Sequence, residues 1–309
     1  MTSARHIDFL SKRKIAFIFS GTLFLISLIS FAVRGLDLGI DFTGGSVYEM
    51  HYNQSVDLDK MRATLEQQGF ADANLQNFGS AADVLIRLKP IENISQKELS
   101  EKVLSVANSS QQQPGELRRV EFVGPQIGDE LINDGGLALL FSLIGVMAYV
   151  SIRFEWKLSV GAIAALFHDT IITMGFFSVF GWEFDMTVLS AILALIGYSI
   201  NDTIVVYDRI RETVRTSRIK ESIHEIVNNA LNDTLSRTIL TSLTVFLTLL
   251  ALALLGGKTI HGFAIAMLIG VIKGTYSSIY IASSLALTFG LSRDDLMPPA
   301  KDNVVDDLP

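Results

Sequence analysis

One acidic residue stands inside a stretch that is otherwise long and apolar enough to cross a membrane. The stretch begins at Leu189, and Asp202 follows Asn201 within it, well before the charged end at Asp208. An ionisable group at membrane depth costs roughly 2.5 kcal/mol or more and usually faces a protein interior or a water path. We therefore expect Asp202 to carry ion chemistry. The alternative is that it only ends the helix and reaches toward the interface, for which aspartate is short.

A second segment supplies a cation for that carboxylate. Arg237 begins an apolar run, and Thr241, Thr244 and Thr248 follow it at spacings of four, seven and eleven residues. Residues at these spacings share one face of a helix. Their hydroxyls either line a water path or bond to a neighbouring helix, and the arginine on the same face favours the path. A carboxylate balanced between ion pairing and desolvation could load and release a proton as helices move.

Three more ionisable residues lie in apolar runs. His168 and Asp169 are adjacent; they are either a second part of the ion site or a separate polar patch in which His168 only packs. Lys273 lies near the middle of the last run and needs a partner, for which Asp169 and Asp202 are the candidates. Small residues recur every fourth position around it, a pattern that lets helices approach closely. This stripe comprises Gly262, Ala266, Gly270, Gly274, Ser278 and Ala282.

Composition places these residues in a membrane protein. The chain has 309 residues, of which 49% are hydrophobic and 18% charged, against about 25% charged in ordinary soluble domains. It has no cysteine, and its net charge of −7 disfavours a nucleic-acid partner. P-loop, G-x-S-x-G and H-E-x-x-H motifs are missing. Two membrane aspartates suggest an intramembrane protease, but the arginine has no role in one. We expect no enzymatic activity and no cofactor or metal other than a coupling proton or sodium ion.

Six apolar runs predict six membrane-spanning helices, joined by polar segments. The predicted spans are 15–33, 135–152, 158–180, 186–206, 238–255 and 262–284. The first run also fits a signal peptide, but it is long and no small-x-small cleavage site follows, so we expect an uncleaved helix. The remaining predicted segments are an N-terminus at 1–14, a loop at 207–237 and a tail at 285–309.

The polar segment 34–134 predicts an α+β domain between the first two spans. Residues 46–52, 73–78, 84–88 and 118–123 read as strands, and residues 58–68 and 95–108 as helices. The order βαββαβ is that of the ferredoxin-like fold. The domain opens on a glycine-rich stretch in which Gly44 and Gly45 permit tight backbone geometry next to Asp41.

Lysine and arginine set the predicted orientation. The N-terminal segment carries four of them, residues 153–157 two and residues 207–237 six, whereas the loops at 181–185 and 256–261 hold only Lys258. The positive-inside rule makes the first set cytoplasmic. Both termini are then cytoplasmic and the 34–134 domain lies on the periplasmic side.

Six sequence motifs resemble those of the SecF branch of the SecD/SecF family, which belongs to the resistance-nodulation-division superfamily of transporters. The resemblance runs from about residue 12 to residue 291. The motifs are GLDLGIDFTGG (35–45), VEFVGPQIGDEL (120–131, with Gly124 and Pro125), FHDTIITMGFFSVFGWEFD (167–185), GYSINDTIVVYDRIRE (197–212), SRTILTS (236–242) and GTYSSIYIAS (274–283). Lys273 departs from the family pattern, in which a small or aliphatic residue is expected.

The resemblance implies a function in protein export. It implies a SecD partner with six more spans, association with the SecYEG channel and with YajC, and a location in the bacterial inner membrane. It also implies that the residues matching Asp202 and Arg237 serve ion-driven movement, through which the outer domain draws a preprotein outward. Two other readings stay open: half of a small-molecule or lipid exporter of the same superfamily, and a scaffold that only stabilises the channel complex.

Overall fold

The chain folds into two compact units. The computed structural model describes residues 6–91, 94–111, 113–216 and 221–297. The first unit comprises Met1–Asp37 and Ala138–Pro309, and the second is Leu38–Leu137. The outermost parts of the predicted termini (1–5 and 298–309) and part of the predicted loop (217–220) lie outside the described residues.

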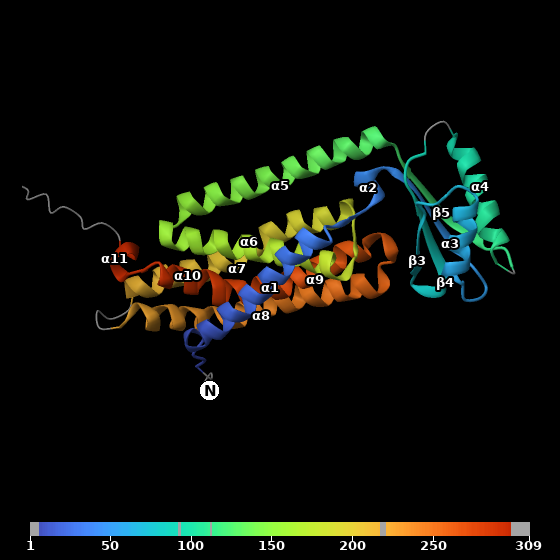
Figure 1. Cartoon of the computed structure of the whole chain (residues 1–309). Coiled ribbons are helices and arrows are strands. Elements are labelled where there is room, and N and C mark those ends of the chain that lie inside the picture. The colour runs from blue at the N-terminus through green and yellow to red at the C-terminus, as the bar shows by residue number, and fades with distance from the viewer. Residues whose placement is uncertain (1–5, 92–93, 112, 217–220, 298–309) are drawn as a thin grey trace, which may run out of the picture. The chain divides into compact units, whose positions relative to one another are not determined.

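Six long apolar helices in the described residues confirm the predicted six-helix membrane architecture. The last of them continues through a π-helical turn at Ser278–Ala282. The helices are α1 (Arg13–Val33), α5 (Pro125–Arg153), α6 (Trp156–Phe180), α7 (Met186–Thr216), α8 (Ile223–Leu255) and α9 (Lys258–Ser277) with α10 (Ser283–Thr288), drawn in Figure 1. Short elements are the 3-10 turn at Leu10–Lys12, strands β1 (Asp37–Leu38) and β6 (Glu183–Phe184), and α11 (Arg293–Leu296).

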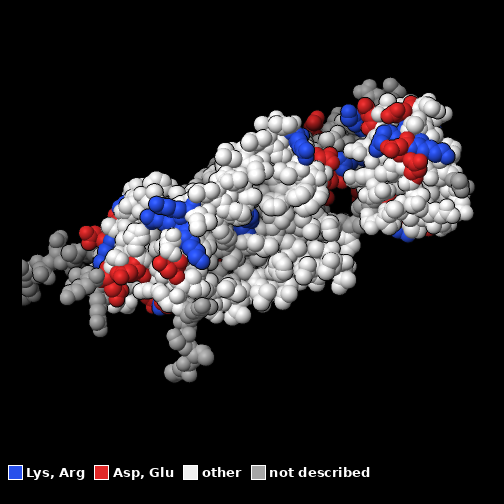
Figure 2. All heavy atoms as spheres, turned by 60° about the horizontal axis from the view of Figure 1, so that its bottom comes forward, with Lys and Arg blue, Asp and Glu red and all other residues white. Residues whose placement is uncertain are grey.

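Three helices form the interior of the helical unit. In each of the α6, α7 and α9–α10 spans, 56% of an apolar 18-residue stretch is buried. The corresponding share is 22% or less in α1, α5 and α8. Glycine permits the closest approaches: a Cβ atom on Gly175 of α6 would lie 2.0 Å from Ser27 Oγ of α1. The outer helices expose many large apolar side chains. On the face seen in Figure 2, most charged side chains of this unit lie at one end, with a few elsewhere. An apolar surface of this kind is suited to contact with lipid or with other membrane helices.

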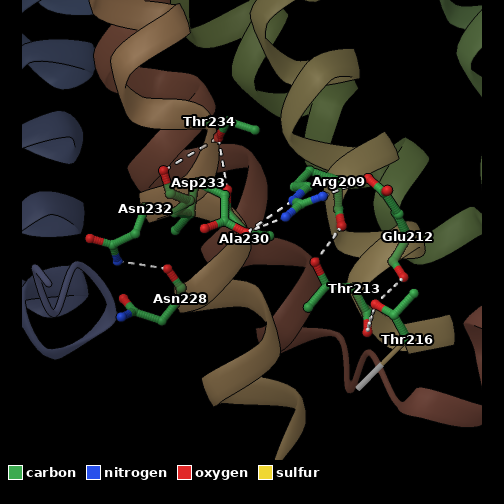
Figure 3. Close-up of polar contacts among 10 residues, drawn as sticks. Arg209, Glu212, Thr213, Thr216, Asn228, Ala230, Asn232, Asp233 and Thr234 are labelled. Atoms are coloured by element: carbon green, nitrogen blue, oxygen red, sulfur yellow. Dashed lines mark hydrogen bonds and ion pairs between the residues drawn. The ribbon is translucent and has the colours of Figure 1, made fainter. Parts of the chain in front are cut away.

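The segment 207–237, predicted as a loop, is largely helical. Helix α7 continues to Thr216 and α8 begins at Ile223. Ser222 and Glu225 form a capping box that fixes the start of α8. Arg209 on α7 points toward Asp233 on α8, with nitrogen and carboxylate oxygen 2.6 Å apart (Figure 3). The polar side chains that follow the predicted span do not end the helix. They pair with one another between α7 and α8, so both helices continue into the predicted loop.

Two asparagines of α8 hold the N-terminal segment. Asn228 Oδ1 accepts a hydrogen bond from the Phe9 amide at 2.9 Å, and its Nδ2 donates to the Ile7 carbonyl at 3.0 Å. One turn further on, Asn232 accepts from the Ile7 amide and donates to the Ile7 carbonyl. The pair thus bonds mainly to the main chain, while Asn228 Nδ2 also lies 3.2 Å from Nε2 of the His6 side chain, and Phe9 is buried beside it.

The second unit has the predicted ferredoxin-like fold. Its elements are β2 (Gly45–His51), α3 (Leu58–Gln67), β3 (Asn74–Phe78), β4 (Ser80–Leu88), α4 (Gln96–Ser109) and β5 (Glu116–Val123). The sheet is antiparallel, in the order β3-β4-β2-β5. Both helices cover one face of the sheet, where Leu65 and Leu99 pack against Tyr48 and Ile86 in one buried core.

The glycine-rich stretch forms a tight turn between the short helix α2 (Ile40–Thr43) and β2. Asp41 lies in the first turn of α2. Gly44 and Gly45 have φ angles of +67° and +118°, values that side chains other than glycine rarely adopt. A Cβ atom on Gly45 would lie 2.2 Å from the Leu88 carbonyl oxygen, and one on Gly44 would lie 3.1 Å from Cα of Pro125. The turn is therefore packed on both sides.

The burial of Tyr52 predicts that this unit loses stability at alkaline pH. The ring is 3% exposed, and burial raises the pKa of Tyr52 to about 12. The phenol is then protonated in the folded unit at a pH where the unfolded chain ionises. Its contribution to stability is complete below pH ~10 and is lost as the pH rises toward 12. We expect Tyr52→Phe to lessen the loss of resistance to proteolysis between pH 10 and 12. An unchanged pH profile in that variant would contradict this.

Candidate ion-coupling site

Asp202 is buried in the middle of a membrane-spanning helix. Its side chain is 3% exposed. The Ser242 hydroxyl of α8 and the Arg237 charge both act on the Asp202 carboxylate. The second carboxylate oxygen, Oδ2, is buried and has no hydrogen-bond partner in the described part of the chain. A buried carboxylate oxygen without a partner is the group that a proton, a water molecule or a small cation would satisfy.

Ser242 also links α7, the helix that carries Asp202, to α9. Tyr198, one turn before Asp202 on α7, donates its hydroxyl to Ser242 Oγ at 3.2 Å. Ser242 Oγ lies 2.6 Å from Thr275 Oγ1 of α9, and Thr275 donates to the Val271 carbonyl. A serine hydroxyl has one hydrogen, so it can be given to Asp202 or to Thr275 but not to both. The hydroxyl chain can therefore reorient when the protonation of Asp202 changes.

Arg237 and its threonines lie on an exposed face of α8. Arg237, Thr241, Thr244 and Thr248 are all exposed, as is Asn201 on α7. The three threonine hydroxyls donate to carbonyls three or four residues earlier in α8. No ion pair within 4 Å joins Arg237 to Asp202 in the described residues, so the predicted pair interacts through charge at a longer distance. The polar stripe faces outward from the helical unit.

Asp169 is a second buried carboxylate, and it joins the three inner helices. It is 0% exposed. Its Oδ2 accepts hydrogen bonds from Ser199 of α7 at 2.6 Å and from Ser277 of α9 at 2.5 Å. Its Oδ1 lies 3.0 Å from Nδ1 of the adjacent His168. His168 is thus bonded to Asp169, and its Nε2 is buried without a partner in the described part of the chain.

Lys273 lies near this second cluster. It is 8% exposed and interacts through charge with Asp169. The predicted small-residue stripe positions it, because α9 packs closely on α7 there. A Cβ atom on Gly270 would lie 2.4 Å from Leu195, whereas one on Gly274 would make an ordinary 3.5 Å contact with Ser199. The inner helices thus carry two separate polar clusters, one at Asp202 and one at Asp169.

Sequence reasoning singled out both carboxylates but not the hydroxyls that surround them. Ser242, Tyr198 and Thr275 connect α7, α8 and α9 around Asp202. Tyr198 precedes Asp202 by four residues, so helical spacing alone places both side chains on one face. Ser242 and Thr275 carry no such signal, because their position depends on how α8 and α9 are rotated.

Comparison with known proteins identifies the architecture. Residues 103–292 match the C-terminal region of the protein export membrane proteins SecD/SecF, and residues 29–56 match the SecD/SecF GG motif. The protein translocase subunit SecF of Vibrio alginolyticus is 46% identical over 299 residues, which is 97% of this chain and 95% of that protein. The SecF of Pseudomonas aeruginosa is 45% identical over 98% of both chains.

A solved structure shows the same fold. The translocon-associated membrane protein SecDF of Thermus thermophilus superposes with a TM-score of 0.83 at 34% identity, covering 94% of this chain. This chain spans 39% of that longer chain. A SecDF structure in a super-membrane-facing form gives a TM-score of 0.67 over 92% of this chain. The family matches, the near full-length identity and the shared fold lead to one conclusion: the chain belongs to the SecD/SecF family.

Proposed function

We propose that this chain is an auxiliary subunit of the Sec protein-export machinery that converts an ion gradient into movement at Asp202. Its full-length relatives are named as translocase subunits. The observation that carries the ion-coupled part is the environment of Asp202: a buried carboxylate with one oxygen bonded to nothing in the described residues and a charged arginine nearby. Asn201, Asp169 and His168 belong to the same proposal as neighbouring groups.

The hydroxyl chain gives the proposal a mechanism. When Asp202 is ionised, Ser242 donates its hydrogen to the carboxylate. When Asp202 takes up a proton, the new O–H donates to Ser242, which then turns toward Thr275 on α9. Loading of the ion therefore changes how α7, α8 and α9 are bonded. Moving one elementary charge across the membrane supplies about 2.3 kcal/mol per 100 mV, which biases states that differ by a few kcal/mol.

The partners and location follow from the same proposal. SecD supplies the second half of the membrane unit and covers the exposed polar face of α8. The SecYEG channel delivers the preprotein, YajC associates with the complex, and the ferredoxin-like unit acts on the preprotein from the periplasmic side. The protein lies in the bacterial inner membrane with both termini in the cytoplasm, because Lys and Arg concentrate in the segments predicted to face that side.

Translocation of a preprotein into inverted membrane vesicles tests the proposal. Vesicles with this chain and its partner are compared with vesicles lacking this chain, under an imposed proton gradient, an imposed sodium gradient or neither. We expect one gradient to increase translocation only when this chain is present, and that gradient identifies the coupling ion. Equal stimulation by this chain with and without a gradient would instead favour the scaffold function.

A further inference from the structure

The Asp169 cluster differs from the Asp202 cluster in how completely its carboxylate is bonded. Both Asp169 oxygens have partners, and those partners come from α6, α7 and α9. An ionised carboxylate only accepts hydrogen bonds, and here three donor groups surround it. One carboxylate oxygen of Asp202 lacks a partner in the described residues, whereas both oxygens of Asp169 have one. The Asp169 side chain is thus fixed in place between the inner helices.

A buried carboxylate that is ionised needs a compensating positive charge. Lys273 lies one helical turn before Ser277, which donates to Asp169, so both side chains leave the same face of α9. Asp169, on the neighbouring helix α6, acts on Lys273 through its charge, and no ion pair within 4 Å joins the two in the described residues. Asp202, by contrast, interacts with Arg237 and Ser242 of α8. This placement favours Asp169 over Asp202 as the charge partner of Lys273.

Aromatic rings hold the ammonium group of Lys273 inside the unit. Its Nζ lies 4.9 Å from the ring centre of Phe19 on α1 and 5.7 Å from that of Tyr276. Tyr276 is fixed in turn by donating its hydroxyl to the Ala16 carbonyl at 2.8 Å and accepting from Ser20. Aromatic faces stabilise a desolvated cation without neutralising it. The two rings thus give the Lys273 ammonium group favourable contacts within the helical unit.

We propose that the Lys273 ammonium group supplies the positive charge that balances Asp169, so that the Asp169 site needs no mobile cation. The site is neutral as built, which leaves Asp202 as the carboxylate that exchanges the coupling ion. That last step rests on the function proposed above. The Asp169 carboxylate and the two serine hydroxyls are oxygen ligands, which suit a small hard cation such as sodium. The ammonium group of Lys273 competes with such a cation for the same negative charge.

Thermal unfolding of the purified full chain in detergent tests this without any export assay. Lys273→Met and Asp169→Asn each leave one buried charge uncompensated, and each is expected to lower Tm by roughly 5 °C or more. The double variant removes both charges and is expected to melt above either single variant. Lys102→Met is the matched control, because Lys102 pairs with Glu98 on the exposed face of α4; its Tm should stay near that of the wild type.

Sodium provides the second measurement. Replacing choline chloride with sodium chloride at equal ionic strength should raise the Tm of Lys273→Met, because sodium can then balance the charge of Asp169. The same exchange should leave the Tm of the wild type and of the double variant unchanged. A double variant whose loss equals the sum of the two single losses, or a Lys273→Met protein that ignores sodium, would overturn the proposal.

Two features keep the test decisive. If Lys273→Met cannot be purified, Asp169→Asn and the double variant still suffice, since the proposal requires the double variant to be the more stable of these two. The readout also needs neither a partner nor a preprotein. A failure of gradient-driven export in vesicles would therefore leave the proposed Lys273–Asp169 pairing intact, and a failure of the pairing would leave the export proposal intact.

Discussion

Asp202→Asn is expected to abolish the gradient-dependent part of preprotein translocation while leaving the complex assembled. Asparagine has nearly the shape of aspartate and can still bond to Ser242, so the packing of α7 on α8 is preserved. It cannot take up and release a proton or neutralise a sodium ion. The vesicle assay should therefore give the wild-type rate without a gradient and the same rate with one. Copurification of the partner checks that assembly is unaffected.

A neighbouring carboxylate supplies the control for this prediction. Asp208 lies on the same helix, but its side chain is 44% exposed and pairs with Arg153 at 2.6 Å. Exposed pairs contribute little, about 0–1 kcal/mol, so Asp208→Asn should keep its response to the gradient. If Asp202→Asn also kept it, Asp202 would be a structural residue and the scaffold function would replace the one proposed here.

Gly45→Ala is expected to unfold the ferredoxin-like unit, with a loss of about 3 kcal/mol or more. Two independent causes add at this residue. The φ angle of +118° is unfavourable for any residue with a side chain. The added methyl group would also lie 2.2 Å from the Leu88 carbonyl oxygen on the paired strand β4. Because the obstacle is backbone inside a sheet, it cannot move aside without breaking strand pairing.

Limited proteolysis of the full chain measures this effect, and a second glycine separates its causes. Gly69 has a φ angle of +91° but no heavy atom within 4 Å of an added Cβ. Gly69→Ala thus reports backbone strain alone and should cost about 1–2 kcal/mol. We expect rapid cleavage of the unit in Gly45→Ala and near wild-type resistance in Gly69→Ala. Equal resistance in the two variants would show that the turn has room to relax.

The sequence predicts those features that depend on composition and local spacing. Long apolar runs define the six helices, because length and hydropathy alone decide what can cross a bilayer. Alternating helix and strand patterns define the βαββαβ unit for a similar reason. Asp202 stands out because a charge inside an apolar run is costly wherever the helix packs.

Features that depend on helix rotation are beyond such reasoning. The hydrogen bonds from Ser199 and Ser277 to Asp169 join residues 30 and 108 positions from it. Serine is common in membrane helices, so nothing in the local pattern distinguishes these two. The spacing of Arg237 and Thr241 correctly places them on one face, but only packing reveals that this face is exposed in the isolated chain. Helical continuation to Thr216 was missed because it depends on pairing between helix ends.

The asparagine pair on α8 has a consequence for biosynthesis. The amide of Phe9 is bonded by a residue 219 positions later in the chain. During translation, residues 7–9 therefore lack this partner until α8 has left the ribosome. Most membrane helices are already inserted by then. Closure of this contact is then one of the last steps of folding. A fusion at the N-terminus would compete with that late step, whereas a fusion at the C-terminus would not.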